Sequence, residues 1–241
     1  MRPMVSTDAD STVARAALRS CALFRDLDEA TLGLLAGAMR SRRFRRNEVI
    51  FHAEDPGDAL FVVTRGQVKI VLPSGESAEP VILVSIGEGG FFGELSLLDG
   101  RPRSATAVAI GATETLVLRR DTFDRLVDAE PALRKAMFTA LAAEIRRLTG
   151  HVEDLHFLDL PGRLARHLLR SAAGEDAGGL PAGPVRLAWP FTQSELAGMI
   201  GGSRQSVNRM LADFVAQGVL RFEGDDLVIP DPAALERAVA R

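Results

Sequence analysis

The spacing of apolar residues changes twice along the chain. Between residues 12 and 40 the leucines recur at helical steps, and Asp28 is placed to cap a short helix from Glu29 to about Met39. From residue 42 to 120, short apolar stretches are separated by Gly, Pro and Asp, and the helical spacing returns from residue 121. The pattern predicts a helical start, a strand-rich centre and a helical second half.

The strand-rich centre is punctuated by turn-forming pairs such as Pro56-Gly57 and Asp99-Gly100. Short strands at close and regular spacing are typical of an all-β barrel or sandwich. The arginine-rich stretch 40–46 is expected to be a solvated strand face, with nucleic-acid contact as the weaker alternative. The expected strands run over residues 49–51, 59–63, 68–72, 81–86, 105–110 and 115–118.

A long helix is expected to begin at Pro131, directly after Glu130. Over residues 131–156 it would be roughly 38 Å long at 1.5 Å per residue. Its apolar residues recur at alternating steps of three and four, as in a coiled-coil seam. We expect this seam to join two copies in a parallel dimer, and the alternative is a helix packed against its own barrel. The seam residues are Phe138, Leu141, Ile145, Leu148, Val152 and Leu155.

The rest of the chain predicts a second domain. Asp159 is placed to cap a helix from about Pro161 to Ala173. A Gly/Pro/Asp-rich loop, two or more helices, a hairpin and a short terminal helix follow, over residues 174–184, 192–217, 219–229 and 232–241. We therefore expect a flexible N-terminus, a barrel domain, a dimerisation helix with its hinge, and a C-terminal domain, over residues 1–17, 18–130, 131–158 and 159–241.

Residues 192–211 fit a helix-turn-helix. Ala197 is the small residue needed where two crossing helices touch, and Gly201 can supply the positive φ of the turn. Ser203 can cap the second helix. The apolar contacts would come from Leu196, Ile200, Val207, Met210 and Leu211.

The exposed face of the second helix carries side chains that read DNA bases. Arg204 and Arg209 can bind guanine through two hydrogen bonds, and Gln205 and Asn208 can bind adenine in the same way. The hairpin that follows would be the wing of a winged-helix domain. The alternative is an ordinary helical hairpin with a solvated polar face. The expected DNA surface also includes hydroxyls suited to phosphates or caps, on Thr192, Ser203 and Ser206.

The charge balance excludes a diffusely basic DNA-binding surface. The net charge is -3 and the pI about 5.9, and residues 161–241 contain nine arginines and nine acidic residues. A single copy would bind DNA weakly. A dimer would double the contacts and read half-sites about 34 Å apart.

Composition excludes several other classes. The single cysteine, Cys21, cannot form an internal disulfide or a cysteine-rich metal or iron–sulfur site. The four histidines lack metal-ligand spacing, so no metal is expected. No apolar run approaches the ~20 residues that span a bilayer, and no signal peptide is apparent, so a cytoplasmic protein is expected. No catalytic triad or paired carboxylates stand out, and the chain is not expected to be an enzyme.

Residues 89–107 suggest an anion site. The glycines at its start let the backbone approach a ligand, and a short helix beginning near Glu94 would direct free amides towards it. Arg103 can neutralise a phosphate charge, Ser104 can donate a hydrogen bond, and Glu94 suits a sugar hydroxyl. The alternative is a barrel corner with an exposed Glu and Arg.

The whole string resembles the phosphate-binding cassette of cyclic-nucleotide-binding domains. The order of β-roll, dimer helix and winged helix-turn-helix resembles the cyclic-AMP receptor protein/FNR superfamily of bacterial transcription factors. The resemblance covers about residues 18–230 and implies an α+β fold. Its most specific strings lie within residues 92–106 and 202–209, and residues 155–159 resemble the family's hinge.

The resemblance implies a role for each matching residue. Gly93 and Glu94 would hold the ribose 2′-hydroxyl of cyclic AMP, and Arg103 and Ser104 its phosphate. The adenine would meet the dimer helix, and binding would shift the hinge. RNA polymerase is an implied partner, through the loop 174–184. The rest of the implied ligand site comprises Phe92, Leu95, Ser96, Ala105, Leu148 and Thr149.

Two residues depart from the family's pattern. Cyclic-AMP-responsive members contact the adenine with two adjacent hydroxyls, but here Leu148 takes one place and only Thr149 keeps a hydroxyl. Gln205 stands where many members carry Glu, so an altered operator preference is expected. Three alternatives stay open: a regulator gated by another ligand, a regulator gated by none, and a nucleotide-binding scaffold that binds a protein. The single Cys21 speaks against an FNR-type iron–sulfur sensor.

Overall fold

The computed structural model describes residues 8–72, 81–173, 183–188, 191–224 and 226–239. The chain divides into two compact units, residues 1–76 with 82–146, and residues 77–81 with 147–241. The division falls inside the long helix α5 (Pro131–Phe157). The sequence places all of this helix in a separate segment, whereas the structure groups its last turns with the C-terminal unit.

Two helices open the N-terminal unit, α1 (Asp8–Ser20) and α2 (Glu29–Ala38). Asp28 caps α2 as expected, because its carboxylate accepts a hydrogen bond from the Thr31 amide at 2.7 Å. The expectation of a flexible segment up to residue 17 is wrong from Asp8 onwards. The reason is that α1 is amphipathic and buries Ala14 and Leu18 against the unit's helical core.

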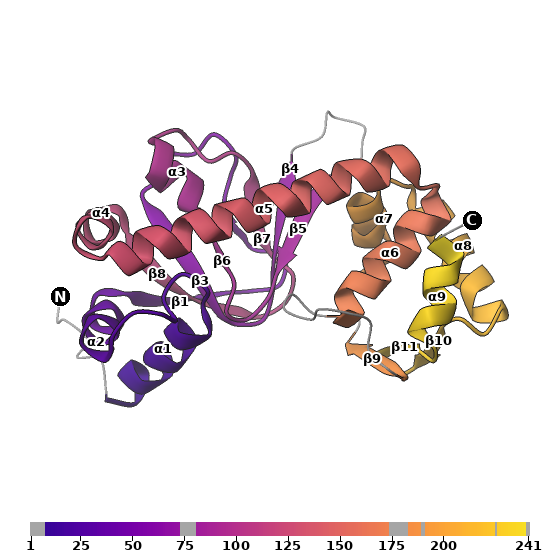
Figure 1. Ribbon diagram of the computed structural model, residues 1–241, viewed down its shortest axis with the longest axis horizontal. Helices are drawn as coiled ribbons and strands as arrows, with labels where there is room; N and C mark the ends of the chain where they lie inside the picture. Colours follow the sequence, from indigo (N-terminus) through magenta and orange to yellow (C-terminus); the bar gives the residue numbers. More distant parts are fainter. Residues whose placement is uncertain (1–7, 73–80, 174–182, 189–190, 225, 240–241) are drawn as a thin grey trace. The chain divides into compact units, whose positions relative to one another are not determined.

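Two four-stranded sheets follow in this unit, with the orders β1-β8-β3-β6 and β2-β7-β4-β5 (Figure 1). They confirm the expected β-roll, and β1 is the solvated strand expected in the arginine-rich stretch, whereas the two-residue β6 adds to the predicted strands. The strands are β1 (Arg40–Phe44), β2 (Val49–Phe51), β3 (Ala59–Arg65), β4 (Val68–Leu72), β5 (Val81–Ile86), β6 (Phe91–Phe92), β7 (Thr106–Ala109) and β8 (Thr113–Arg119).

Strand β3 is buried on both faces, which explains its unbroken apolar sequence. Leu60 and Val62 join the core formed with the helices, where Leu18, Phe24 and Phe123 also lie. The alternate residues point into the roll, between the two sheets. The roll core contains Phe44, Ala59, Phe61, Val63, Val68, Phe92, Ala107 and Ala109, with Phe51 packed against it.

Three helices complete the N-terminal unit: α3 (Glu94–Asp99), α4 (Arg120–Ala129) and the first part of α5. Leu133 and Met137 of α5 are buried in the helical core, so this part of the helix is fixed to the roll. Beyond it, α5 continues to Phe157 in one uninterrupted run, as its spacing predicts.

The C-terminal unit begins with the end of α5 and with α6 (Leu160–Ala173). Asp159 caps α6 as expected, accepting a hydrogen bond from the Gly162 amide at 2.8 Å. A three-stranded sheet of order β10-β11-β9 confirms the hairpin and adds β9, which the sequence did not predict. The remaining elements are β9 (Val185–Ala188), α7 (Gln193–Ile200), α8 (Arg204–Ala216), β10 (Arg221–Glu223), β11 (Asp226–Ile229) and α9 (Pro232–Val239).

Candidate nucleotide and DNA sites

The cassette turns at Gly93, which follows β6 and directly precedes α3. Its φ is 84°, in the left-handed region that favours glycine. A Cβ on Gly93 would lie 2.6 Å from Nη1 of Arg103. The turn therefore requires glycine both for its conformation and for the room it leaves the guanidinium.

Arg103 is almost fully buried, with 3% of its surface exposed. Its Nη1 donates to the Gly93 carbonyl at 2.6 Å, and its Nη2 donates to the Ala59 carbonyl at 2.7 Å. Its Nε is buried and has no hydrogen-bond partner among the described residues. Burial lowers the pKa of Arg103, and the nearby carboxylates of Asp58 and Glu94 oppose that shift.

The structure brings most of the predicted cassette residues together around this arginine. Burial raises the pKa of Glu94, and the carboxylate of Glu144 on α5 raises it further. Ser104 is exposed next to the buried Arg103, so its hydroxyl remains accessible. Of the other predicted cassette residues, Phe92, Ser96 and Ala105 are buried and Leu95 is exposed.

Arg120 is a cassette residue that sequence reasoning missed. As the first residue of α4, it donates to the carbonyls of Ser96, Leu97 and Gly57 at 2.7, 3.1 and 2.8 Å. These bonds tie α3 to the loop before β3. Nothing in the local sequence distinguishes Arg120 from the chain's other arginines, because its partners lie more than twenty residues away.

The arrangement fits an anionic ligand. A buried cation with an unpartnered Nε lies beside a left-handed glycine and an exposed hydroxyl, and a phosphate accepts hydrogen bonds from such groups. The carboxyl of Glu94, at the start of α3, can accept from a hydroxyl. The residues present therefore suit a cyclic phosphate and a ribose.

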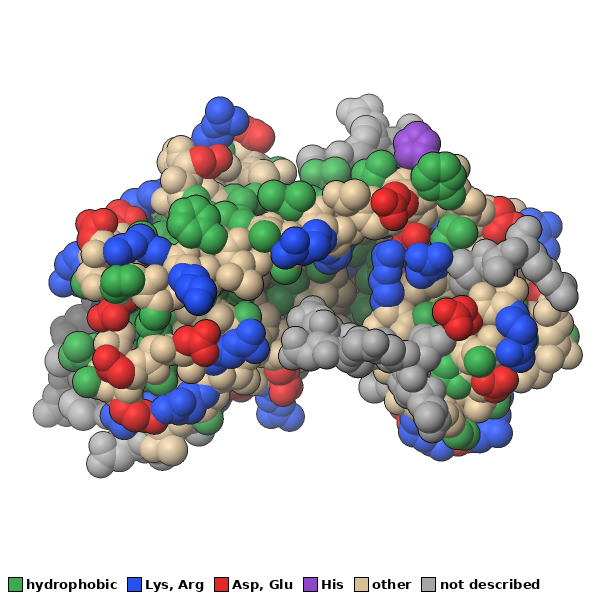
Figure 2. Space-filling view, in the orientation of Figure 1, with side chains coloured by type: hydrophobic (Ala, Val, Ile, Leu, Met, Phe, Trp, Pro, Cys, Tyr) green, Lys and Arg blue, Asp and Glu red, His purple; other side chains and the backbone are tan. Residues whose placement is uncertain are grey.

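Helix α5 carries the expected apolar stripe, and most of that stripe is exposed. Phe138 has 73% of its surface exposed and Ile145 64%, and apolar side chains follow the helix in Figure 2. Leu141 is half-buried, and Leu148, Val152, Leu155 and Thr149 are exposed. Leu148 and Thr149 belong to the C-terminal unit, whereas the cassette belongs to the N-terminal one.

The helix-turn-helix forms as predicted. Thr192 caps α7 and shares a capping box with Glu195, and Ser203 caps α8 by accepting from the Ser206 amide at 3.1 Å. Gly201 occupies the turn with a φ of 69°. Ala197 is fully buried. The predicted apolar contacts are also buried, at Leu196, Ile200, Val207, Met210 and Leu211.

Arg163 of α6 supports this turn and was also missed by sequence reasoning. Its Nη1 donates to the Ile200 carbonyl at 2.9 Å, next to Gly201. A cationic donor at the C-terminus of α7 is favourable both for the unpaired carbonyl and for the helix dipole. Helix α6 therefore stabilises the turn through Arg163.

The face of α8 that was expected to read bases is open. The side chains of Arg204, Gln205 and Arg209 are exposed and make no hydrogen bond or ion pair with any other described residue. Asn208 is also exposed, but its carbonyl oxygen accepts from the Gln193 amide at 3.0 Å. Sequence reasoning did not single out Gln193, which reaches this face from the first turn of α7.

Two comparisons place the chain in a family. A model of the cyclic nucleotide-binding domain matches residues 41–130, and a model of the Crp-like helix-turn-helix domain matches residues 162–238. The chain belongs to the cyclic-AMP receptor protein/FNR superfamily.

Individual relatives agree with this assignment. A CRP-like cAMP-activated global transcriptional regulator of Mycobacterium tuberculosis is 31% identical over 220 residues, which are 91% of this chain and 97% of that protein. The cyclic AMP receptor protein of Thermus thermophilus is 30% identical over 219 residues, with shares of 91% and 97%. The structure of the c-di-GMP responsive regulator CLP of Xanthomonas campestris has a TM-score of 0.69 at 24% identity, covers 85% of this chain and 100% of that one, and supports the fold alone.

Membership of this superfamily confirms the α+β fold class. The chain is a transcription regulator with a cyclic-nucleotide-binding domain and a DNA-binding helix-turn-helix. Its relatives are transcription regulators, and this agrees with the expectation that it is not an enzyme.

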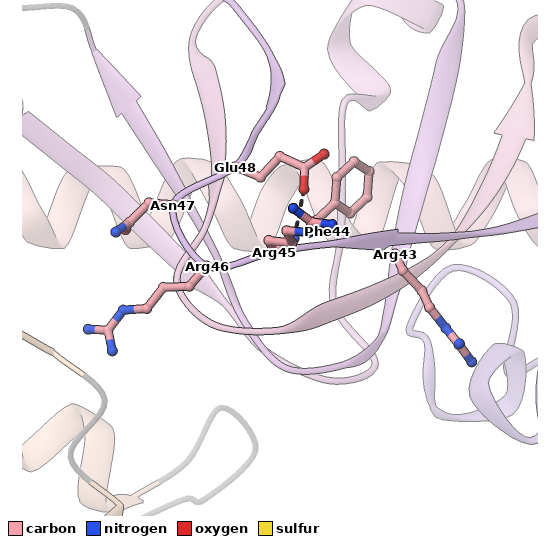
Figure 3. Close-up of a pocket in the computed structure, with 6 residues that line it drawn as sticks. All are labelled: Arg43, Phe44, Arg45, Arg46, Asn47 and Glu48. Carbon is pink, nitrogen blue, oxygen red and sulfur yellow. Dashed lines mark hydrogen bonds between the residues drawn. The ribbon is translucent and has the colours of Figure 1, made fainter.

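The arginine-rich turn between β1 and β2 is a separate feature of this regulator. It lines an open hollow with residues 43–48, where the Glu48 carboxylate accepts from the Arg45 amide at 2.7 Å (Figure 3). Arg43 and Arg46 point in different directions in this view, and Arg43 pairs with Glu114. The arginines do not converge on one anion, as expected for a solvated strand face.

Three further expectations concern metal ions, membrane spans and the contact with RNA polymerase. No group of three or more metal-ligating side chains occurs among the described residues, and none of their helices is long and apolar enough to span a membrane. Most of the loop expected to contact RNA polymerase, residues 174–182, lies outside the described residues.

Proposed function

We propose that this regulator is a homodimer that binds cyclic AMP in its cassette and, once bound, binds palindromic operator DNA. The observation that carries the proposal is the buried Arg103, with its unpartnered Nε, beside the left-handed Gly93. The cAMP-activated relatives, at 30–31% identity over nearly the whole chain, support the choice of nucleotide.

In this proposal Arg103 and Ser104 hold the cyclic phosphate, while Gly93 and Glu94 hold the ribose hydroxyl. Phe92, Leu95, Ser96 and Ala105 shape the cassette around them. Leu148 and Thr149 meet the base, and the single remaining hydroxyl on Thr149 makes the base contact weaker than a pair of hydroxyls would.

The exposed stripe on α5 supports the dimer. Apolar side chains at alternating steps of three and four, exposed on one helix, are what a parallel coiled coil buries between two copies. The seam would consist of Phe138, Leu141, Ile145, Leu148, Val152 and Leu155. A dimer would also compensate for the weak DNA binding expected of a single copy without a basic surface, because it presents Arg204 and Arg209 twice.

Gating requires two arrangements of the chain, and the junction between α5 and α6 is the proposed hinge. Asp154, which is buried near the end of α5, pairs with Arg170 at 2.8 Å and with Arg166 at 3.5 Å on α6. These ion pairs favour one angle between the helices. Cyclic AMP gates DNA binding only if it binds the DNA-competent arrangement more tightly.

The DNA surface in this proposal is the exposed face of α8. Arg204, Gln205, Asn208 and Arg209 read base edges, and the hydroxyls of Thr192, Ser203 and Ser206 lie towards the phosphates while they cap the helices. Transcription would then be regulated through RNA polymerase.

A second candidate is the same regulator gated by another nucleotide. Leu148 favours it, because an apolar side chain cannot hydrogen-bond to the adenine edge.

Calorimetric titration of the full-length chain with cyclic AMP, cyclic GMP and cyclic di-GMP, paired with binding to operators selected in vitro from random DNA, tests both candidates. We expect cyclic AMP to bind and to strengthen operator binding. Binding of another nucleotide with that effect would establish the second candidate. No heat and no effect on DNA from cyclic AMP would overturn the first.

A further inference from the structure

The charge of Arg103 is balanced in an unusual way for a buried arginine. A buried guanidinium without a partner is costly, and a carboxylate is its common counterion. Among the described residues, no carboxylate lies within ion-pair distance of Arg103, which instead donates to the carbonyls of Gly93 and Ala59. The carboxylates of Asp58 and Glu94 favour the charge from beyond that distance, and a direct contact with the guanidinium would add to their effect.

An aromatic ring lies against the guanidinium. The centroid of the Phe51 ring is 4.2 Å from Cζ of Arg103, and that of Phe61 is 5.8 Å away. Phe51, Phe61 and Phe92 form a trio with centroids 5.1–5.8 Å apart. The electron-rich face of an aromatic ring attracts a cation, most strongly where water is excluded.

The backbone fixes the ring and the cation relative to one another. A register shift, typical of a β-bulge, lies between Val49 and Phe51 where β2 pairs with β7, and such bulges redirect side chains. Beyond Phe51, the Glu54 amide donates to the Arg103 carbonyl, and the Arg103 amide donates to the Asp55 carbonyl, both at 2.9 Å. Phe51 and Arg103 are therefore presented from directly connected segments.

An aromatic ring and a carboxylate differ in how much of the charge and how many of the N–H donors of Arg103 remain available to a ligand. A carboxylate would neutralise Arg103 and occupy its N–H donors, in competition with a phosphate. The ring stabilises the cation without neutralising it, and the buried Nε remains without a partner. We propose that Phe51 is a positioning residue for nucleotide binding, which holds the Arg103 guanidinium by its π face so that Nε is kept for the anionic phosphate.

This inference rests on nucleotide binding by the cassette, and it predicts a loss specific to the ring at position 51. Phe51→Leu keeps an apolar side chain but removes the π face. We expect the calorimetric affinity of the full-length chain for cyclic AMP to fall about tenfold. An unchanged affinity would overturn the proposal.

Phe44 offers a matched control. It lies in the same roll core, but its ring faces the exposed Arg42, 5.1 Å from the centroid, instead of Arg103. We expect Phe44→Leu to lower the unfolding temperature at least as much as Phe51→Leu while leaving the affinity for cyclic AMP unchanged. Equal losses of affinity in both variants would mean that Phe51 acts only through core packing.

A graded substitution separates charge from shape. Phenylalanines with one, two and three ring fluorines at position 51 progressively withdraw electrons from the π face while nearly preserving its size. The affinity for cyclic AMP should fall with each added fluorine at position 51 and stay constant at position 44. A flat series at position 51, or the same slope at position 44, would contradict the proposal.

A ligand-free measurement distinguishes failure of this inference from failure of the proposed function. In the NMR spectrum of the ligand-free chain, the Phe51 ring current should displace the Nε–H resonance of Arg103, and Phe51→Leu, but not Phe44→Leu, should abolish the displacement. If cyclic AMP gives no heat but the displacement is present, the proposed function fails and the positioning stands. If the Nε–H resonance of Arg103 is not displaced, the positioning role of Phe51 is wrong, whichever nucleotide binds.

Discussion

Arg103 of the cassette and the two arginines on the exposed face of α8 lie in opposite environments. Arg103 is buried, bonded to two carbonyls and packed on a ring before any ligand arrives. Arg204 and Arg209 are exposed and make no polar contact with other described residues. The guanidinium of Arg103 loses little conformational freedom on binding, whereas those of α8 must be ordered by the DNA.

The difference fits what each region must recognise. A small anion offers few contacts, so a site whose side chains are already ordered loses less of that binding free energy to ordering them. DNA offers a long and repetitive surface, and flexible side chains on a rigid helix can adapt to the sequence they meet. The comparison predicts a large, ligand-specific loss when the buried arginine is changed and a smaller, DNA-specific loss when an exposed one is changed.

The largest effect is expected from Arg103→Ala. It removes the charge-assisted hydrogen bonds proposed to hold the phosphate and leaves the carbonyls of Gly93 and Ala59 without these donors. We expect the affinity for cyclic AMP to fall about 100-fold or more, measured by calorimetry. Because the variant also loses stability, Arg103→Lys serves as its companion.

Arg103→Lys keeps the charge but loses the planar fork and its donors. It should fold with a near-normal circular dichroism spectrum and still bind cyclic AMP at least tenfold more weakly than the unaltered chain. An affinity within twofold of the unaltered chain would remove Arg103 from the binding site.

Arg209→Ala should produce the converse pattern. Loss of one bidentate base contact costs about 1–3 kcal/mol, or roughly 5- to 150-fold in operator affinity per half-site, measured by fluorescence anisotropy. Calorimetric affinity for cyclic AMP should stay unchanged. If operator affinity did not change, the assignment of α8 as the recognition helix would be wrong.

Acid should weaken the C-terminal unit through a partly buried histidine. Burial, followed by the charge of Arg170, lowers the pKa of His167 to about 4 from its ordinary 6.5. The folded state holds the neutral ring while the unfolded chain takes up the proton, so this stability is fully present above pH 6.5 and is lost as the pH falls towards 4. At pH 5 the loss is about 1–2 kcal/mol, and it should appear as a lower unfolding temperature than at pH 7.5.

His167→Gln should flatten this pH dependence, and His156→Gln, on the exposed end of α5, should leave it unchanged. A smaller slope should remain because burial also lowers the pKa of His151. An equally steep dependence in His167→Gln would show that other groups control it.

The smallest effect is expected from Gln193→Ala. The Gln193 amide donates to Asn208, so its loss frees one base-reading side chain without removing it. We expect operator affinity to change less than about threefold while base preference broadens at the position Asn208 reads, as measured by selection from random DNA. Gln217→Ala, at the other end of α8, is the control, and an unchanged preference in Gln193→Ala would contradict the idea.

Local sequence patterns were enough for elements that carry their own signals. The bounds of β2, β4 and β5 coincide with their apolar stretches, and Asp28, Asp159, Thr192 and Ser203 cap helices because capping depends on a residue and its near neighbours. The two-residue β6 is too short to show a pattern. The helical steps from residue 12 indicate the second half of α1, and the burial of Ala14 and Leu18 distinguishes the helix from a flexible terminus.

The missed site residues depend on contacts distant in sequence. Phe51 meets Arg103 because β2 pairs with β7 in one sheet and the loop after β2 bonds to the Arg103 backbone. Arg120 finds its carbonyl partners through the packing of α4 on the cassette. Gln193 and Arg163 likewise meet α8 and the turn through the crossing of helices. Motifs identified the groups that would touch a ligand, and the fold was needed to find those that hold them in place.

The central claim is that nucleotide binding by the cassette and operator binding by α8 are energetically coupled. The effect of the operator on the affinity for cyclic AMP tests this claim most directly. The dissociation constant of cyclic AMP should be measured on the full-length chain with and without a saturating selected operator. Coupling is reciprocal, so the operator should tighten cyclic AMP binding by the same factor by which cyclic AMP tightens operator binding, about 5- to 150-fold. Equal dissociation constants with and without the operator would contradict the account.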